Sequence, residues 1–203
     1  MTQVLTPTAR AEFLALTRDL EGVCTWLYLD VRGFVTVGIG NLVDPVGLLW
    51  LAGLDWNIAG RKATDQEVWE AWATVKAAQG FRKRGGGFFR SLTRVRATDE
   101  SIDQLVGRTI DRFAAALAGF FPEMVAWPDV AQVAVMLMAW ALGPDFPHHW
   151  PKLTAACRAL DFATAAAECH MNDENQNASF KRRNAAVKAH FEAASQLFPG
   201  PAQ

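Results

Sequence analysis

Residues 21–41 read EGVCTWLYLDVRGFVTVGIGN, and this stretch decides how we interpret the rest of the chain. It places Glu21, Asp30 and Thr36 at intervals of nine and six residues, with glycines following at positions 33, 38 and 40. The chemistry of such a set depends on the elements that carry it, so we consider those elements first.

A helix is expected to end at Glu21. Thr6 can cap its start, Pro7 suits its first position, and apolar residues follow at helical spacing. Gly22 is a natural C-terminal stop. The helix dipole disfavours a negative charge there, and partial desolvation would also raise the pKa of Glu21. A carboxyl that stays protonated near neutral pH is what a general acid requires.

A hairpin is expected to follow, with strands near 26–29 and 34–40 and Asp30 at the turn. One face of the second strand carries a hydroxyl between small residues: Phe34, Thr36, Gly38 and Gly40. Glycines in a strand mark either the close approach of a ligand or bulges in a small twisted hairpin. The glycines alone leave both interpretations open.

The whole stretch resembles the catalytic segment of the phage-type lysozymes, the glycoside hydrolase family of the T-even phage endolysins. The matching positions are Glu21, Gly22, Tyr28, Asp30, Gly33, Thr36, Gly38 and Gly40. One position departs from the family pattern, because Asn41 stands where the family usually has histidine. Asparagine keeps a local hydrogen bond but cannot titrate.

The resemblance implies a lysozyme that cleaves the β-1,4 bond between N-acetylmuramic acid and N-acetylglucosamine in bacterial peptidoglycan. It implies Glu21 as general acid, with Asp30 and Thr36 holding a water on the opposite face of the sugar, and hence inversion. Inversion needs carboxylates about 6.5–9.5 Å apart.

Supporting residues are also expected. Arg183 stands eight residues before Phe191 on an apolar stripe of the last helix, a spacing that in the family belongs to the arginine that pairs with the catalytic glutamate. Without that pairing, its stem would simply lie along the surface. Asn41 is a second supporting residue, and Phe34, Gly38, Gly40 and Trp140 are candidate substrate contacts.

Composition limits the alternatives. The chain has 203 residues, 51% of them hydrophobic, and net charge −1, which predicts one globular domain and argues against a dedicated nucleic-acid binder. The three cysteines are interpreted as buried thiols. We expect no cofactor and no metal: His148 and His149 lack acidic or cysteine partners at ligand spacing.

The N-terminal residues show no signal peptide, and the apolar run 130–142 is too short to span a membrane. We therefore expect synthesis in the cytoplasm, no transmembrane segment, and action on the periplasmic cell wall of a target or host bacterium. The protein is expected to be a monomer. Its biological role is either that of a phage endolysin or that of an antibacterial effector with an immunity protein or a secretion-machine carrier as partner.

The expected fold class is α+β, mostly α, with the two lobes of a lysozyme over residues 1–203. Residues 1–97 form an N-terminal lobe with a helical insertion near 43–97, and residues 98–203 supply a linking helix and a helical C-terminal lobe. Helices are expected at 64–80, 98–120, 129–142, 151–160, 162–170 and 178–198, with a polar loop at 172–177.

Three features of this part of the chain stay open. Trp69 and Trp72 form either a sugar-stacking ledge or a packing ridge. The basic stretch at 81–89 either holds anionic peptidoglycan or lipid headgroups or is a solvated, mobile loop before a helix. The alternatives to an enzyme are a lysozyme-like module that binds peptidoglycan without cleaving it, and a membrane-active or partner-binding module that works through residues 43–97.

Overall fold

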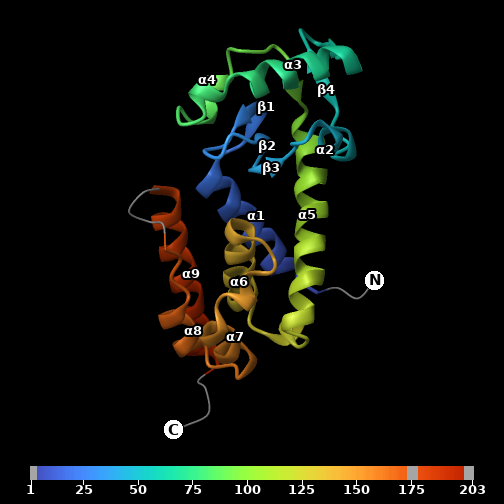
Figure 1. Cartoon of the computed structure of the whole chain (residues 1–203). Coiled ribbons are helices and arrows are strands. Elements are labelled where there is room, and N and C mark those ends of the chain that lie inside the picture. The colour runs from blue at the N-terminus through green and yellow to red at the C-terminus, as the bar shows by residue number, and fades with distance from the viewer. Residues whose placement is uncertain (1–3, 173–177, 199–203) are drawn as a thin grey trace. The chain divides into compact units, whose positions relative to one another are not determined.

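The computed structural model describes residues 4–172 and 178–198, and its fold is mixed α+β and mostly helical, as the sequence predicts (Figure 1). The chain divides into two compact units. One unit is Glu21–Arg108, and the other combines the described residues up to Leu20 with those from Thr109 onward. This division groups the first helix with the C-terminal helices, and the predicted lobe boundary at residues 97 and 98 stays a prediction.

The unit Glu21–Arg108 contains the predicted hairpin. β1 (Cys24–Leu29), β2 (Val35–Gly38) and β3 (Asn41–Leu42) form an antiparallel sheet in that order. Tyr28 lies opposite Thr36, and Leu29 lies opposite Val35. Because opposite residues point to the same face, Tyr28 and Thr36 are neighbours on one side of this sheet.

A second sheet, which the sequence reasoning missed, lies in the predicted helical insertion. Its strands are β4 (Trp56–Ile58), β5 (Arg61–Lys62) and β6 (Arg96–Ala97), in the order β5-β4-β6. Ala59 and Gly60 join β4 to β5, both at positive φ (50° and 83°). Two positive φ values define the type I′ hairpin turn, which alanine rarely enters, so the sequence signal was weak.

Helices α2 (Val46–Leu51), α3 (Asp65–Ala77) and α4 (Gly86–Phe89) complete this unit, with a 3₁₀ turn at Gln79–Phe81. The predicted start of α3 is confirmed, and a capping box fixes it, because Thr64 and Glu67 exchange backbone and side-chain hydrogen bonds. The helix ends at Ala77 rather than at the predicted residue 80, since the chain tightens there into the 3₁₀ turn.

Two long helices begin at threonine caps, and the second of them crosses the boundary between the units at Arg108 and Thr109. α1 (Pro7–Glu21) begins as predicted, with the Thr6 hydroxyl accepting a hydrogen bond from the Ala9 amide. α5 (Asp99–Phe120) begins with the same device, because the Thr98 hydroxyl accepts from the Ser101 amide. Both helices therefore begin at caps that the sequence specifies.

The C-terminal helices pack around α6 (Asp129–Leu142), whose residues 131–139 are all buried. α7 (Pro151–Arg158), α8 (Phe162–Glu168) and α9 (Ala178–Leu197) follow, with 3₁₀ turns at Met124–Ala126 and Phe146–His148. α9 packs along α6 and α8 (Figure 1), burying an apolar stripe made of Val187, Phe191 and Ala194. A helix that is apolar on every side, such as α6, needs this enclosure.

α1 joins this group through its buried face, where the rings of Phe13 and Trp140 meet edge to face at 5.6 Å. This packing is the physical reason that the residues before Leu20 group with the C-terminal helices. α7 ends at Arg158 rather than at the predicted residue 160, and Leu160 has a positive φ of 57°. The predicted loop at 172–177 lies outside the described residues except for Asn172.

No helix among the described residues is long and apolar enough to cross a membrane.

Candidate functional site

Glu21 is the last residue of α1, where the prediction placed it. Gly22 follows at φ +70°, a left-handed conformation that ends the helix and turns the chain into β1. The Glu21 side chain is exposed. It is therefore a carboxyl at a helix end, reached by solvent.

Asp30 occupies the hairpin turn and organises it. Its Oδ1 accepts hydrogen bonds from the backbone amides of Arg32 and Phe34, each at 2.9 Å. Two backbone hydrogen bonds of 3.0 Å also close this turn. The Gly33 amide donates to the Asp30 carbonyl, and the Asp30 amide donates to the Phe34 carbonyl. Within the described residues the other carboxylate oxygen, Oδ2, has no hydrogen-bond partner, so this fixed carboxylate keeps one oxygen for a water or a ligand.

Two side chains from α3 and the turn after it hold the Asp30 turn from outside. Gln79 Nε2 donates to the Gly33 carbonyl at 3.0 Å, and Lys76 Nζ donates to the same oxygen at 3.3 Å. Lys76 also forms an ion pair of 2.6 Å with the buried Asp44, whose Oδ2 accepts from the Val35 amide at 3.0 Å. We call these three residues, Asp44, Lys76 and Gln79, the turn clamp.

The sequence reasoning missed the turn clamp. Its one signal was periodicity, which placed Gln79 on the same helix face as the buried Val68 and Val75. Nothing in the local pattern of Lys76 or Asp44 indicates a partner 32 residues away. The clamp gives the predicted insertion a structural role, which is to support the turn that carries Asp30.

Thr36 lies in β2 and is only 4% exposed. Its hydroxyl donates to the Phe34 carbonyl at 3.2 Å, which leaves the oxygen lone pairs as acceptors. Burial, with smaller contributions from Cys24 and Asp30, raises the pKa of the neighbouring Tyr28 above its ordinary value. Tyr28 is therefore a neutral phenol at physiological pH, placed beside Thr36 and close enough to Asp30 to respond to its charge.

The residues from the end of β2 to the start of β3 form a tight turn. Gly38 has φ +66°, and a Cβ there would lie 3.0 Å from Asn41 Oδ1 and 3.1 Å from Ile102 Cγ2. Asn41 is 7% exposed, and its Oδ1 accepts from the Ile39 amide at 3.3 Å. Asn41 thus makes the local hydrogen bond expected of it, while the exposed Gly40 has φ +80° and no atom near a Cβ position.

Two aromatic residues predicted as substrate contacts lie in different settings. Phe34 is 38% exposed, with Arg32 and Lys76 over its ring at 5.3 Å and 5.7 Å. Trp140 in α6 is half-buried, with Phe113 at 6.0 Å in addition to Phe13. Phe34 is a partly exposed ring on the Asp30 hairpin with two cations over it, whereas Trp140 packs among aromatic side chains of its own unit.

Arg183 points inward from α9, as its place on the apolar stripe predicts. It is 4% exposed and lies over the Phe180 ring at 5.6 Å. Burial lowers its pKa to about 10, so it stays charged at neutral pH. Its expected pairing with Glu21 stays a prediction.

The structure places the two tryptophans of α3 and the predicted histidine pair in different surroundings. Trp72 Nε1 donates to the Val43 carbonyl at 2.9 Å, which fixes Trp72 as a packing residue, while Trp69 is 46% exposed. His148 meets the Phe120 ring edge to face at 4.8 Å. In residues 4–172 and 178–198, no group of three His, Cys, Asp or Glu side chains could hold a metal ion.

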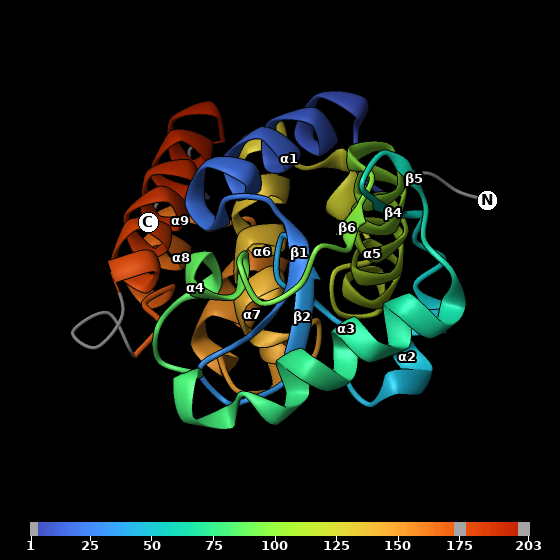
Figure 2. The same cartoon turned by 90° about the horizontal axis from the view of Figure 1, so that it is seen from above.

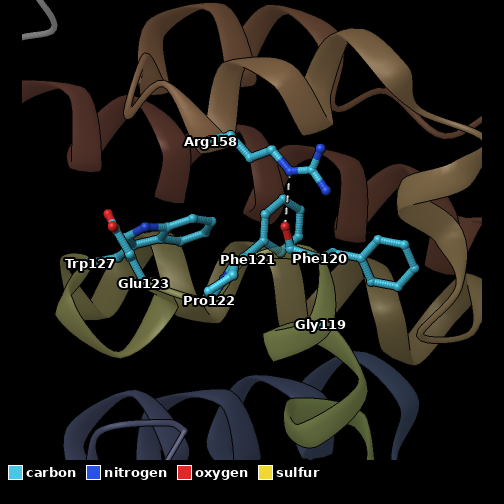
Figure 3. Close-up of a pocket in the computed structure, with 7 residues that line it drawn as sticks. All are labelled: Gly119, Phe120, Phe121, Pro122, Glu123, Trp127 and Arg158. Atoms are coloured by element: carbon cyan, nitrogen blue, oxygen red, sulfur yellow. Dashed lines mark hydrogen bonds between the residues drawn. The ribbon is translucent and has the colours of Figure 1, made fainter.

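A pocket of about 330 Å³ lies at the end of α5, within the helical unit (Figure 3). Arg158 reaches over it and donates from Nε to the Phe120 carbonyl at 3.0 Å. None of the predicted site residues lines this pocket, whose walls are Gly119, Phe120, Phe121, Pro122, Glu123, Trp127 and Arg158. The residues that line this pocket do not include any residue of the Asp30 hairpin.

The cysteines are free thiols, and Cys157 and Cys169 are buried as predicted, whereas Cys24 is only partly buried. Burial raises the pKa of the Cys169 thiol to about 11, so it is not a nucleophile near neutral pH. On the hairpin, burial also raises the pKa of the Cys24 thiol, which favours its protonated form, so the candidate reactive groups there are carboxyl and hydroxyl oxygens.

Comparison with models of protein families gives no match to this chain, and comparison with curated proteins gives none either.

Proposed function

We propose that this chain is a muramidase that hydrolyses the β-1,4 bond between N-acetylmuramic acid and N-acetylglucosamine in bacterial peptidoglycan. The observation that carries the proposal is the Asp30 turn. Two backbone amides of this turn bind one oxygen of the Asp30 carboxylate and leave the other oxygen available. The hairpin directly follows α1, the helix that ends at Glu21. The glycosidase chemistry of paired carboxylates needs one such fixed, ionised group.

In the proposed mechanism Glu21 protonates the glycosidic oxygen as the bond to the anomeric carbon breaks. Asp30 Oδ2 and Thr36 Oγ1 hold a water on the opposite face of the sugar, and Asp30 accepts a proton from that water as its oxygen attacks the anomeric carbon. The product is inverted at that carbon, with one new reducing N-acetylmuramic acid end for each bond cleaved. Arg183 orients Glu21 by a charge-assisted hydrogen bond.

The division into two units agrees with the two lobes of a lysozyme-like fold, which we propose as the finer description of this α+β chain. The long helix α5, which passes from one unit into the other, then corresponds to the helix that links the lobes. In this proposal the substrate is the wall of a target or host bacterium, reached by an endolysin or by a delivered effector with an immunity partner.

Digestion of purified sacculi tests the activity and separates it from the non-catalytic alternative. New reducing N-acetylmuramic acid ends, detected by borohydride reduction and mass spectrometry, are the expected product. Sacculi that retain the protein on sedimentation without new ends would instead indicate a binding module. Release of stem peptides would indicate a different hydrolase.

The stereochemistry tests the mechanism separately. Proton NMR of a soluble glycan substrate should show the α anomer first, as water attacks the face opposite the leaving group. Asp30→Asn should lower the rate by about 100-fold or more, since general base catalysis contributes about 10²–10⁴-fold. A loss of only a few-fold would remove Asp30 from the role of holding the water.

A further inference from the structure

The segment from residue 71 to residue 98 is strongly cationic, although the whole chain has net charge −1. It contains no acidic residue and seven basic ones: Lys76, Arg82, Lys83, Arg84, Arg90, Arg94 and Arg96. Charge segregation of this degree within one segment creates a local positive potential that the net charge of the chain does not reveal.

The middle of this segment is a fixed ribbon packed on β1. Trp26 Nε1 donates to the Gly86 carbonyl at 2.8 Å, and the side chains of Phe89 and Val95 are 0% and 3% exposed. A Cβ at Gly86 would lie 3.1 Å from Cys24 Sγ, so the backbone itself lies against the strand. Figure 2 shows the chain from α4 to β6 crossing β1, and α4 itself contacts β1. Phe89 and Val95 therefore fix the ribbon, and the Thr93 hydroxyl is also buried, whereas the side chains of Arg90, Leu92 and Arg94 are exposed.

Five of the cations are exposed: Arg82, Lys83, Arg84, Arg90 and Arg94. None of the five forms an ion pair with a described residue. Exposed cations elsewhere in the chain do form such pairs, for example Arg61 with Glu67 at 2.5 Å and Arg182 with Asp19 at 2.7 Å. The five charges are thus not neutralised within the described part of the chain.

Apolar side chains stand among these charges. Phe81 is 49% exposed and Leu92 is 36% exposed. The Phe81 ring stacks on Phe88 at 4.8 Å, and the Arg84 guanidinium lies 5.4 Å from the centre of the Phe88 ring. We call the exposed cations together with Phe81 and Leu92 the basic face.

We propose that the basic face binds the surface of an anionic phospholipid bilayer. Cations at such a surface attract the lipid phosphates, and apolar side chains between them enter the boundary between headgroups and acyl chains. The apolar residues favour a bilayer over a soluble polyanion. One face of the Phe81 ring is already covered by Phe88, and the aliphatic Leu92 offers no surface on which a nucleic-acid base could stack.

Vesicle sedimentation tests the charges. The intact protein should bind vesicles of phosphatidylglycerol and phosphatidylcholine and should not bind vesicles of phosphatidylcholine alone. The combined change Arg82→Ser, Lys83→Ser and Arg84→Ser should weaken binding roughly 100-fold. Each cation near an anionic membrane surface contributes about 1 kcal/mol to the binding free energy. The matched control, Lys62→Ser with Lys152→Ser and Lys188→Ser, removes the same charge from exposed sites outside the basic face and should bind as wild type does. Equal weakening by both sets would overturn the proposal.

A second variant tests the apolar side chains and excludes a loss of folding as the cause. Phe81→Ser with Leu92→Ser keeps every charge and should weaken vesicle binding about tenfold, with an unchanged far-ultraviolet circular dichroism spectrum. If this variant binds vesicles as wild type does and soluble polyphosphate or RNA displaces them completely, the basic face is a polyanion site and the bilayer proposal fails. Glu21→Gln should bind vesicles normally, so this result and the outcome of the muramidase test are independent.

Discussion

Gln79 donates a hydrogen bond of 3.0 Å to the carbonyl oxygen of Gly33, and this bond joins the end of α3 to the turn that carries Asp30. Lys76 binds the same oxygen and continues to the buried Asp44. The turn that presents the candidate base is therefore held by residues from a segment that sequence reasoning left without a role.

Removing the Gln79 side chain from the turn clamp should lower the rate of catalysis strongly and the stability of the fold only slightly. Gln79→Ala leaves the Gly33 carbonyl with a single, longer bond to Lys76, and the loss of one hydrogen bond costs about 1 kcal/mol of stability. The looser Asp30 should lower kcat about tenfold on a soluble glycan with little change in KM, because small misplacements of a catalytic group are costly.

Gln66→Ala is the matched control for this effect, since Gln66 lies near the start of the same helix and its side chain donates to the exposed Glu70. It should leave kcat unchanged. A similar loss in both variants would show that the effect comes from α3 as a whole and not from the turn clamp.

Gly33→Ala and Gly40→Ala should differ in stability, although both glycines have positive φ, +86° and +80°. A Cβ at Gly33 would lie 2.3 Å from Gln79 Oε1, whereas nothing lies within 4 Å of a Cβ at Gly40. Gly40→Ala should cost only the backbone strain of about 1 kcal/mol, and Gly33→Ala should cost about 2–3 kcal/mol in urea unfolding.

The double variant Gly33→Ala with Gln79→Ala separates the two causes of the larger loss. It should recover the steric part and retain the strain of the backbone, together with the loss of about 1 kcal/mol that Gln79→Ala causes alone. If Gly33→Ala and Gly40→Ala unfold at the same urea concentration, the close approach of Gln79 to Gly33 is not present in solution.

The capping box of α3 should make stability depend on acid. Hydrogen bonds to Arg61 and to the Thr64 amide lower the pKa of Glu67 from 4.5 to about 2. A depressed folded-state pKa contributes stability that is fully present above the unfolded value and is lost as pH falls through the folded value. The contribution is small because Glu67 is at the surface and solvent screens the pair.

Urea midpoints of wild type and Glu67→Gln measure this dependence. The variant should be less stable at pH 6, and the difference should shrink between about pH 4.5 and about pH 2 as Glu67 is protonated in wild type. A difference that stays constant down to pH 2 would mean that the charge of Glu67 has no part in the cap.

Gln132 is a buried polar residue in the most apolar helix, and its replacement by leucine should be destabilising. Its Oε1 accepts from the Thr6 amide at 3.0 Å, and its Nε2 donates to the Trp127 carbonyl at 3.0 Å. Gln132→Leu leaves both backbone groups without this partner, at a cost of about 1–3 kcal/mol. A thermal unfolding midpoint equal to that of wild type would contradict this role.

The parts of the fold that short-range signals specify were predictable from the sequence. Thr6 caps α1 and Gly22 follows its end as predicted, and Thr64, Thr98 and Asp161 cap helices that begin where the pattern placed them. The hairpin with Asp30 at its turn is also as predicted. Each of these depends on residues within a few positions of one another.

The parts that depend on distant contacts were not predictable. The pairing of β4 with β6 joins Trp56 to Ala97, and the turn clamp joins Gln79 to Gly33. Short strands with little alternation give no periodic signal, and no local rule identifies the carbonyl that a glutamine side chain will reach. The same limit applies to the candidate site, where the residue types were readable and their supporting contacts were not.

The central claim is that Glu21 is the acid of a muramidase, and one comparison tests it most directly. Sacculi are digested with wild type, with Glu21→Gln and with Glu12→Gln, an isosteric control on the same helix whose carboxylate lies 3.1 Å from His190. Mass spectrometry of the released muropeptides should show reducing N-acetylmuramic acid ends from wild type and Glu12→Gln, and none above background from a folded Glu21→Gln. Reducing ends released by Glu21→Gln at the wild-type rate would contradict the account.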